Sequence, residues 1–77
     1  MAKYQILAEE LRQSILKNIY QPGDRLPSEM ELQEQFQISR QTVRNALELL
    51  EKQGFVRSRQ GSGTYVVDRE AEEQKKS

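Results

Sequence analysis

The sequence contains neither cysteine nor histidine among its 77 residues. Their absence excludes disulfides, thiolate chemistry and the usual zinc sites, which need Cys or His ligands. There is also no apolar run long enough to cross a membrane and no stretch that resembles a signal peptide, so we expect a cytoplasmic protein. A chain of this length allows one small domain with a modest core.

Net charge is lacking as well, because 12 Lys and Arg residues balance 12 Asp and Glu residues. This balance at first argues against a nucleic-acid partner, but the distribution of the charges matters more than their sum. Acidic residues dominate positions 24–34 and 68–73, whereas basic residues outnumber acidic ones between positions 40 and 59. The charge pattern is therefore compatible with a locally basic face.

The stretch from Ile38 to Phe55 carries the signals of a complete helix. Ser39 is a favourable N-cap because its hydroxyl can accept an unpaired backbone N–H of the first turn. Gly54 can take the left-handed conformation that often ends a helix. A core-facing stripe is predicted from apolar residues at helical spacing, namely Val43, Ala46, Leu47 and Leu50. The other side carries Arg40, Gln41, Arg44, Asn45 and Glu48.

The polar side of this helix begins at its N-terminus, where the helix dipole and free N–H groups favour an anion. Arg, Gln and Asn are residue types that contact base edges, and they also bind phosphates. The pattern predicts a recognition helix for DNA. The alternative is an ordinary solvent-exposed helix, and this stretch taken alone favours that alternative.

Two further helices are predicted before this one. The first has apolar residues at helical spacing and ends near Asn18, which tolerates the left-handed conformation. Its apolar residues are Tyr4, Leu7, Leu11 and Ile15. A Pro-Gly turn at positions 21–24 follows, and Arg25-Leu26 are expected to form a very short strand. Ser28 and Glu31 then have the spacing of a capping box that begins a short second helix.

The second helix is expected to end near Gln37-Ile38, a tight turn before the capped helix described above. A short helix, a tight turn and a longer helix with a polar N-terminus predict a helix-turn-helix. A plain helical hairpin is the alternative. It is weakened because the polar residues of the last helix lie at the end that would enter a groove.

After Gly54 the pattern changes from helical to extended. Two β-rich runs, 55–59 and 64–67, flank the glycine-rich loop 60–63 and predict a hairpin. A lone Gly-x-Gly is a weak signal of a phosphate-binding loop, but such loops lead from a strand into a helix. A hairpin after a helix-turn-helix is the wing of a winged helix, and here Arg57 and Arg59 flank its tip with positive charge.

Together these stretches resemble the DNA-binding domain of the GntR family of bacterial transcriptional regulators, most closely its HutC-like branch. The matching segments cover nearly everything up to Val67, in order and correctly spaced, so the combination is far more specific than any one motif. They are Y-x-x-L-x-x-x-L-x-x-x-I from Tyr4, P-G-D-R-L-P-S-E from Pro22, I-S-R-Q-T-V-R-N-A-L from Ile38 and G-F-V-R-S-R-Q-G-S-G-T-Y-V from Gly54. The resemblance implies an α+β winged helix-turn-helix of three helices and a small antiparallel hairpin in residues 1–67. A polar linker at 68–77 would follow.

The resemblance also implies where DNA is contacted. Bases and phosphates would be contacted from the N-terminus of the recognition helix, and the minor groove from the tip of the wing. The start of the second helix and an N-terminal basic residue would lie close to the backbone. The residues concerned are Ser39, Arg40, Gln41, Thr42 and Arg44, then Gln60, Gly61 and Ser62, and finally Ser28, Glu29 and Lys3.

Two positions depart from the family pattern. Gln37 stands where the family often has Gly, so a left-handed backbone there would be strained by on the order of 1 kcal/mol. Met30 stands where many members have a polar or basic residue that can approach a base edge. A base contact from Met30 is therefore in doubt, and packing of its side chain is the alternative.

By resemblance, the function is sequence-specific binding of double-stranded DNA at a near-palindromic operator. The chain would belong to a repressor released by a small-molecule effector on a C-terminal domain missing here. The isolated domain is expected to be monomeric and to pair on DNA, whereas the full-length protein would be a homodimer. No cofactor, metal or membrane partner is expected. A winged helix for protein–protein or RNA contact is the alternative, and an enzyme is remote because no carboxylate pairs with a nucleophile.

Overall fold

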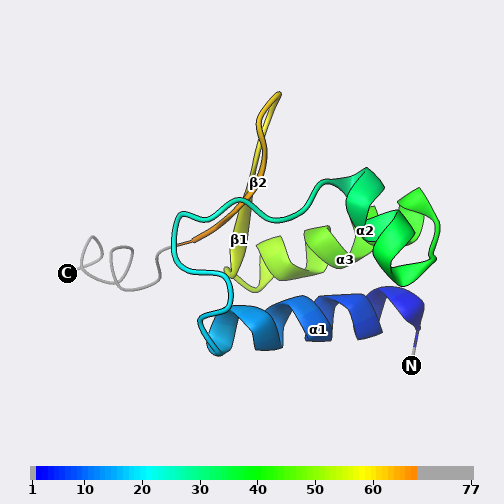
Figure 1. The fold of residues 1–77 in the computed structure, drawn as a ribbon, viewed down its shortest axis with the longest axis horizontal. Coiled ribbons are helices and arrows are strands. Elements are labelled where there is room, and N and C mark those ends of the chain that lie inside the picture. The colour runs from blue at the N-terminus through cyan, green and yellow to red at the C-terminus, as the bar shows by residue number, and fades with distance from the viewer. Residues whose placement is uncertain (1, 68–77) are drawn as a thin grey trace.

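The computed structural model describes residues 2–67, in which three helices precede a two-stranded antiparallel hairpin (Figure 1). The helices are α1 (Lys3–Leu16), α2 (Glu29–Phe36) and α3 (Arg40–Lys52), and the strands are β1 (Val56–Arg59) and β2 (Gly63–Val66). This is the winged helix-turn-helix expected from the sequence. The polar linker expected at 68–77 lies outside the described residues.

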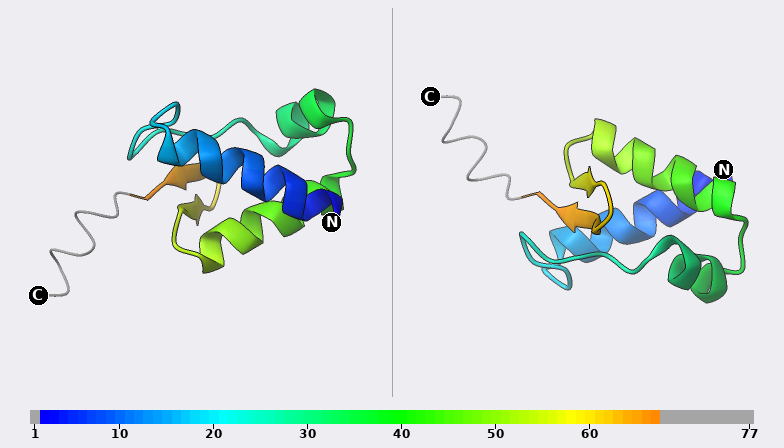
Figure 2. Two further views of the ribbon diagram at one scale, coloured as in Figure 1. Left: turned by 90° about the horizontal axis from the view of Figure 1, so that it is seen from below. Right: turned by 90° about the horizontal axis from the view of Figure 1, so that it is seen from above.

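The elements are arranged so that α2, α3 and the hairpin share one side of the molecule. In Figure 1, α1 lies below α3, and the hairpin projects upward beyond the helices. Seen from above in Figure 2, α2 and α3 lie in front of α1 and the hairpin points toward the viewer. Within residues 2–67, none of the helices is both long and apolar enough to cross a membrane.

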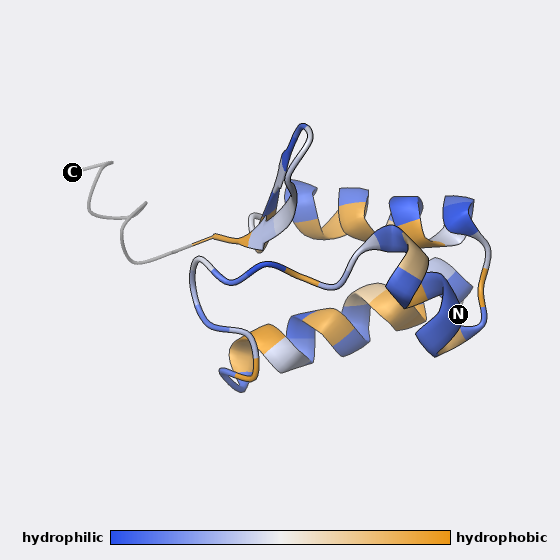
Figure 3. Cartoon of the chain, turned by 45° about the horizontal axis from the view of Figure 1, so that its top comes forward, coloured by the Kyte–Doolittle hydropathy of each residue, from blue (hydrophilic) through white to orange (hydrophobic). Residues whose placement is uncertain are grey.

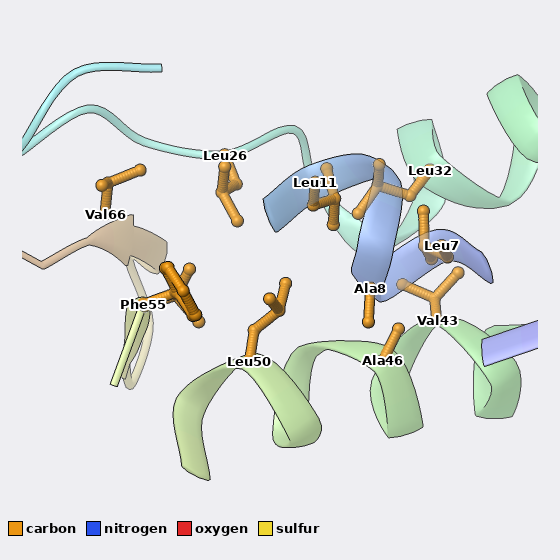
Figure 4. Close-up of a cluster of buried hydrophobic side chains, with 11 residues drawn as sticks. Leu7, Ala8, Leu11, Leu26, Leu32, Val43, Ala46, Leu50, Phe55 and Val66 are labelled. Atoms are coloured by element: carbon orange, nitrogen blue, oxygen red, sulfur yellow. The ribbon is translucent and has the colours of Figure 1, made fainter. Parts of the chain in front are cut away.

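Apolar side chains from every element meet in one core (Figure 4). Val43, Ala46 and Leu50 of α3 are completely buried, as the predicted stripe requires. Ala8 lies opposite Ala46 where α1 crosses α3. Because the distance between packed helices depends on the side chains at their contact, these two small residues allow a close approach.

Both ends of α3 have the caps predicted from the sequence. The Ser39 hydroxyl accepts a backbone N–H of the first turn at 3.2 Å. At the other end, the N–H of Phe55 donates to the Leu50 carbonyl at 3.0 Å and that of Gly54 to the Glu51 carbonyl at 3.1 Å. With Gly54 at a φ of 84°, this is the Schellman pattern. Local sequence therefore fixes where α3 begins and ends.

The start of α2 differs in one bond from the expected capping box. The Ser28 hydroxyl accepts the backbone N–H of Glu31 at 3.1 Å, as predicted. The Glu31 carboxylate, however, accepts a bond from the Ser28 hydroxyl at 3.3 Å rather than from the Ser28 backbone. One hydroxyl thus makes both bonds of this cap, and Glu31 remains near the positive end of the helix dipole.

A short segment before α2 pairs with the outer edge of β2 through an isolated bridge. Arg25 pairs with Tyr65 as an antiparallel bridge, and the N–H of Leu26 donates to the Thr64 carbonyl at 2.8 Å. The short strand predicted at Arg25-Leu26 is therefore present only as a bridge at Arg25, beside a sheet of the two strands β1 and β2 in residues 2–67. Since an isolated hairpin is marginally stable in water, this third segment anchors the wing to the helices.

Two departures predicted from the sequence have different outcomes. Gln37 has a φ of 54° and a ψ of 51°, so the left-handed backbone considered there is present. The alternative that the Met30 side chain packs is wrong, however, because that side chain is 70% exposed. Met30 lies two residues before the buried Leu32, which is more than half a helical turn away, and therefore faces solvent.

Replacing Gln37 by Gly is expected to raise the free energy of unfolding by up to about 1 kcal/mol. Gly avoids the left-handed penalty of about 1–2 kcal/mol, less the extra entropy that Gly gives the unfolded chain. The same change at Gln35, on the exposed surface of α2, should instead lower stability by about 0.5–1 kcal/mol. Urea unfolding followed by circular dichroism measures both, and a destabilised Gln37→Gly would contradict the strain.

Candidate nucleic-acid interface

A groove of about 560 Å³ lies between α3, the start of α2 and the hairpin. Arg44 and Leu47 border it from α3, and Thr64 borders it from β2. The groove also brings together residues predicted to contact DNA from three separate segments. They are Ser28, Glu29, Arg44, Gln60, Gly61 and Ser62.

The outer side of α3 is polar, whereas the side toward α1 is hydrophobic (Figure 3). Arg40, Gln41 and Arg44 are exposed there, as predicted. The Gln41 side-chain amide donates to the Asn45 side-chain oxygen at 2.9 Å. Asn45 was not among the predicted contact residues, although its i,i+4 spacing from Gln41 was a usable signal. The two amides form one polar unit on the exposed face.

The hydroxyls at the start of α3 are already engaged with each other. The Ser39 and Thr42 hydroxyl oxygens lie 2.8 Å apart, and the Ser39 oxygen also accepts the Thr42 backbone N–H. These side chains therefore hold the first turn in shape. A ligand at this end of the helix can be bound by the remaining lone pairs of the two hydroxyls and by the first-turn N–H groups.

The Glu29 carboxylate pairs with both arginines of α3. Its two oxygens lie 3.5 Å from Arg40 Nε and 3.4 Å from Arg44 Nε. The arginines are one turn apart, so a single carboxylate from α2 can reach both. The arginine side chains are 67% and 56% exposed, so each pair contributes at most about 1 kcal/mol. The pairs nevertheless orient both guanidinium groups, and this role of Glu29 was not predicted from the sequence.

The hairpin is tied to α3 by a hydrogen bond that joins the Ser58 N–H to the Glu51 carboxylate at 2.9 Å. Ser58 stands opposite Thr64, whose carbonyl is bonded on the other side of β2 to Leu26. In an antiparallel pair of this kind the Ser58 N–H points outward from the sheet edge. Glu51 therefore satisfies an edge group and fixes the hairpin relative to α3, a contact that was also not predicted.

The tip of the hairpin consists of exposed residues held in a tight turn. The Ser62 N–H donates to the Arg59 carbonyl at 3.1 Å, and Gly61 has a φ of 80°. A Cβ added at Gly61 would meet no atom within 4 Å. The free protein thus needs Gly61 for its backbone conformation and not for space.

Lys3 is not brought to this groove. It is exposed at the start of α1, in the layer farther from the hairpin tip (Figure 1), and its contact with DNA stays a prediction. The Glu9–Arg12 pair also lies on α1. There, hydrogen bonds from Arg12 and then Gln13 hold the pKa of Glu9 below its ordinary value, and the bond to Glu9 raises the pKa of Arg12. Neither residue borders the groove.

Comparison with known families shows that the model described as bacterial regulatory proteins, gntR family, matches residues 3–66. The chain belongs to the GntR family. The expectation from sequence motifs is therefore confirmed at the level of the family, whereas its placement in the HutC-like branch stays a prediction.

Individual relatives agree with this assignment. The GntR chain is 49% identical over 67 residues to the uncharacterized HTH-type transcriptional regulator YdcR of Escherichia coli K12, covering 87% of this chain and 14% of that protein. It is 48% identical over 65 residues to the mannosyl-D-glycerate transport/metabolism system repressor MngR of the same organism, covering 84% of this chain and 27% of that protein. The chain thus spans about a quarter or less of the length of these relatives.

Among solved structures, the GntR chain is similar to the AraR DNA-binding domain in its crystal structure with operator ORR3. The TM-score is 0.85 at 39% identity, with 87% of this chain and 81% of that chain covered. Family and fold together identify the described residues as a DNA-binding domain of the winged helix-turn-helix type.

Replacing Glu29 by Gln is expected to free both arginines of α3 and to remove a negative charge from the groove. If one more phosphate is neutralised as a result, affinity for unrelated duplex DNA should rise roughly eightfold at 0.1 M salt. Discrimination in favour of a selected duplex should fall, because the arginines are no longer held in one geometry. Competition binding measures both, with Glu34→Gln on the exposed surface of α2 as the control. Equal behaviour of the two variants would contradict this role of Glu29.

Proposed function

We propose that this GntR domain reads a near-palindromic operator in double-stranded DNA as part of a bacterial transcriptional repressor in the cytoplasm. The observation that carries the proposal is the groove, which is bordered both by Arg44 of α3 and by the tip of the hairpin. Relatives named as repressors, including MngR, support the regulatory role. Binding, not catalysis, is then the activity of the domain.

In this proposal the N-terminal part of α3 enters the major groove, which is wide enough to admit a helix. Arg40 and Arg44 contact base edges or phosphates, while Gln41 with its partner Asn45 can present amides to a base edge. The first-turn N–H groups and the α3 dipole favour a phosphate at the helix start. The Glu29 carboxylate pairs with both arginines in the free protein, and these ion pairs are exchanged for contacts with DNA on binding.

The hairpin tip enters the adjoining minor groove in the same proposal. Gln60, Gly61 and Ser62 are exposed there and carry no bulky apolar side chain. No atom of the free protein crowds a Cβ at Gly61. A larger side chain at this position would therefore clash with DNA in the minor groove and would also strain the backbone, whose φ is positive. Lys3 and Ser28 contribute backbone contacts at the margin of the interface.

The rest of a longer protein would supply the switch. The curated relatives are several times longer than this chain, which leaves room for a domain that binds a small-molecule effector and forms a homodimer. Effector binding would then change the spacing of two reading heads and release the operator. This part of the proposal concerns the whole protein and not the described residues.

Selection of duplexes from a random-sequence pool, followed by titration of two variants, tests the reading role of α3. Arg40→Ala and Arg44→Ala should each weaken binding to the selected duplex by about 1–3 kcal/mol if the arginine contacts a base edge, and should relax preference at that base pair. If the arginine contacts only phosphate, binding should weaken about equally on all sequences.

Arg12→Ala is the matched control, since it removes the same charge from α1 and should leave affinity unchanged within about twofold. Failure of the wild-type chain to select any sequence would refute the proposed function. So would wild-type affinity in both α3 variants on a selected duplex, because the recognition helix would then read nothing.

The free chain is expected to be monomeric, with two copies occupying one near-palindromic duplex. Without a covalent partner the second copy gains no effective concentration, so binding should be weaker than that of an intact dimer. Few cations are available per head, so the salt dependence should be shallow, about −0.9 in logarithmic slope per phosphate contact. Sedimentation of the chain with full-site and half-site duplexes measures the stoichiometry. A stable dimer without DNA would contradict the pairing, as would one copy saturating the full site.

A further inference from the structure

Three arginines share one face of the hairpin sheet. In the strand register Arg57 stands opposite Tyr65, and the bridge places Arg25 on the other side of Tyr65. Arg59 stands opposite Gly63, two residues before Tyr65. Residues directly opposite one another share a face of a sheet, as do residues two apart along a strand. All five residues therefore lie on the same face.

Two contacts support this placement. The Arg59 guanidinium carbon lies 5.7 Å from the centre of the Tyr65 ring, a cation–π distance. The Arg25 side chain lies over Gly63, where an added Cβ would be only 2.9 Å from Arg25 Nε. Gly63 therefore provides the space in which Arg25 lies, in addition to adopting a φ of 127°. Tyr65 and Gly63 thus position the two guanidinium groups.

The face that carries Arg25, Arg57 and Arg59, here called the basic face, is turned away from the core. Val56 and Val66, the residues on the alternate positions of the same strands, are buried. All three arginines are exposed. Arg25 and Arg59 also border the groove, so the basic face reaches the rim of the groove near the hairpin tip.

The charges of the basic face differ from those of α3. Arg40 and Arg44 share the carboxylate of Glu29. In the part of the chain that the structure describes, neither Arg25 nor Arg59 takes part in an ion pair. Their guanidinium groups are therefore not held in an ion pair with a carboxylate, and both are available to an external anion.

The geometry of a minor groove determines which anion is within reach. This groove is about 6 Å wide in B-DNA and is bounded by the phosphates of both strands. A wing inserted into it meets one strand on the side toward α3 and the other strand on its outer face. Guanidinium groups match phosphate oxygens with two parallel hydrogen bonds, so the outer face has suitable chemistry.

We propose that the basic face is a second phosphate-binding site, centred on Arg25 and Arg59, that holds the DNA strand across the minor groove from α3. The site rests on the proposed function, since it needs the wing to enter a minor groove. It adds to the wing tip a contact that carries no base information but fixes the depth and direction of insertion. Arg57 contributes charge farther from the tip.

The test is the salt dependence of binding to a duplex selected by the wild-type chain. Arg25→Gln/Arg59→Gln should reduce the logarithmic salt slope by about 1.8, twice the 0.9 per phosphate contact, and lower affinity roughly 60-fold at 0.1 M salt. Each single variant should lose about half of the slope change. Discrimination against a duplex with one altered base pair should be unchanged, because phosphate contacts are not sequence-specific.

Lys17→Gln/Lys52→Gln is the matched control, which removes the same charge from exposed positions outside the groove. Arg25→Lys/Arg59→Lys keeps the charge and should restore most of the slope, which separates phosphate binding from a change in the fold. A wild-type slope in the Gln variant would overturn the site, as would a loss no larger than that of the control. The proposed function would survive either result if Arg44→Ala still weakened binding. If the wild-type chain selected no duplex, both proposals would be overturned.

Discussion

Burial of the apolar stripe of α3 fixes the rotation of that helix about its axis, and the rest of the interface depends on this rotation. Val43, Ala46 and Leu50 have no exposed surface, and they pack against α1 and the base of the hairpin. Successive residues of a helix are 100° apart, so a shift of one position would turn apolar side chains outward and bring polar ones into the core. Arg40 and Arg44 face solvent because the apolar stripe on the opposite side of α3 must lie in the core.

The fixed orientation of α3 defines the interface only if the hairpin is also held in place. Two contacts at the base of the hairpin hold it. On one edge the segment at Arg25-Leu26 is bonded to β2 through an isolated bridge, and on the other edge the Glu51 carboxylate accepts the outward N–H of Ser58. The first contact joins the sheet to the segment that leads into α2, and the second joins it to α3. The width of the groove is therefore set from both edges of the sheet.

The sequence was sufficient to predict the parts of this arrangement that depend on neighbours along the chain. Apolar spacing and the Ser39 and Gly54 caps locate α3, and the alternation after Gly54 locates the hairpin. The pairing of Glu29 with two arginines, and the space that Gly63 leaves for Arg25, join residues more than ten positions apart. Periodicity and caps carry no information on such pairs. Met30 was misjudged because its apolar residue type was considered without its spacing of two residues from the buried Leu32, which places it on the opposite side of α2.

The balance of charge across the interface has a consequence for how the domain approaches DNA. A carboxylate beside Arg40 and Arg44 lowers their attraction for phosphate at a distance, whereas Arg59 of the hairpin takes part in no ion pair within residues 2–67. Long-range attraction depends on uncompensated charge, and base reading depends on geometry at contact. The hairpin is thus suited to capture the backbone of any duplex, and α3 is suited to reject the wrong sequence after capture. A chain with no formal net charge can bind DNA because these two tasks lie on different elements.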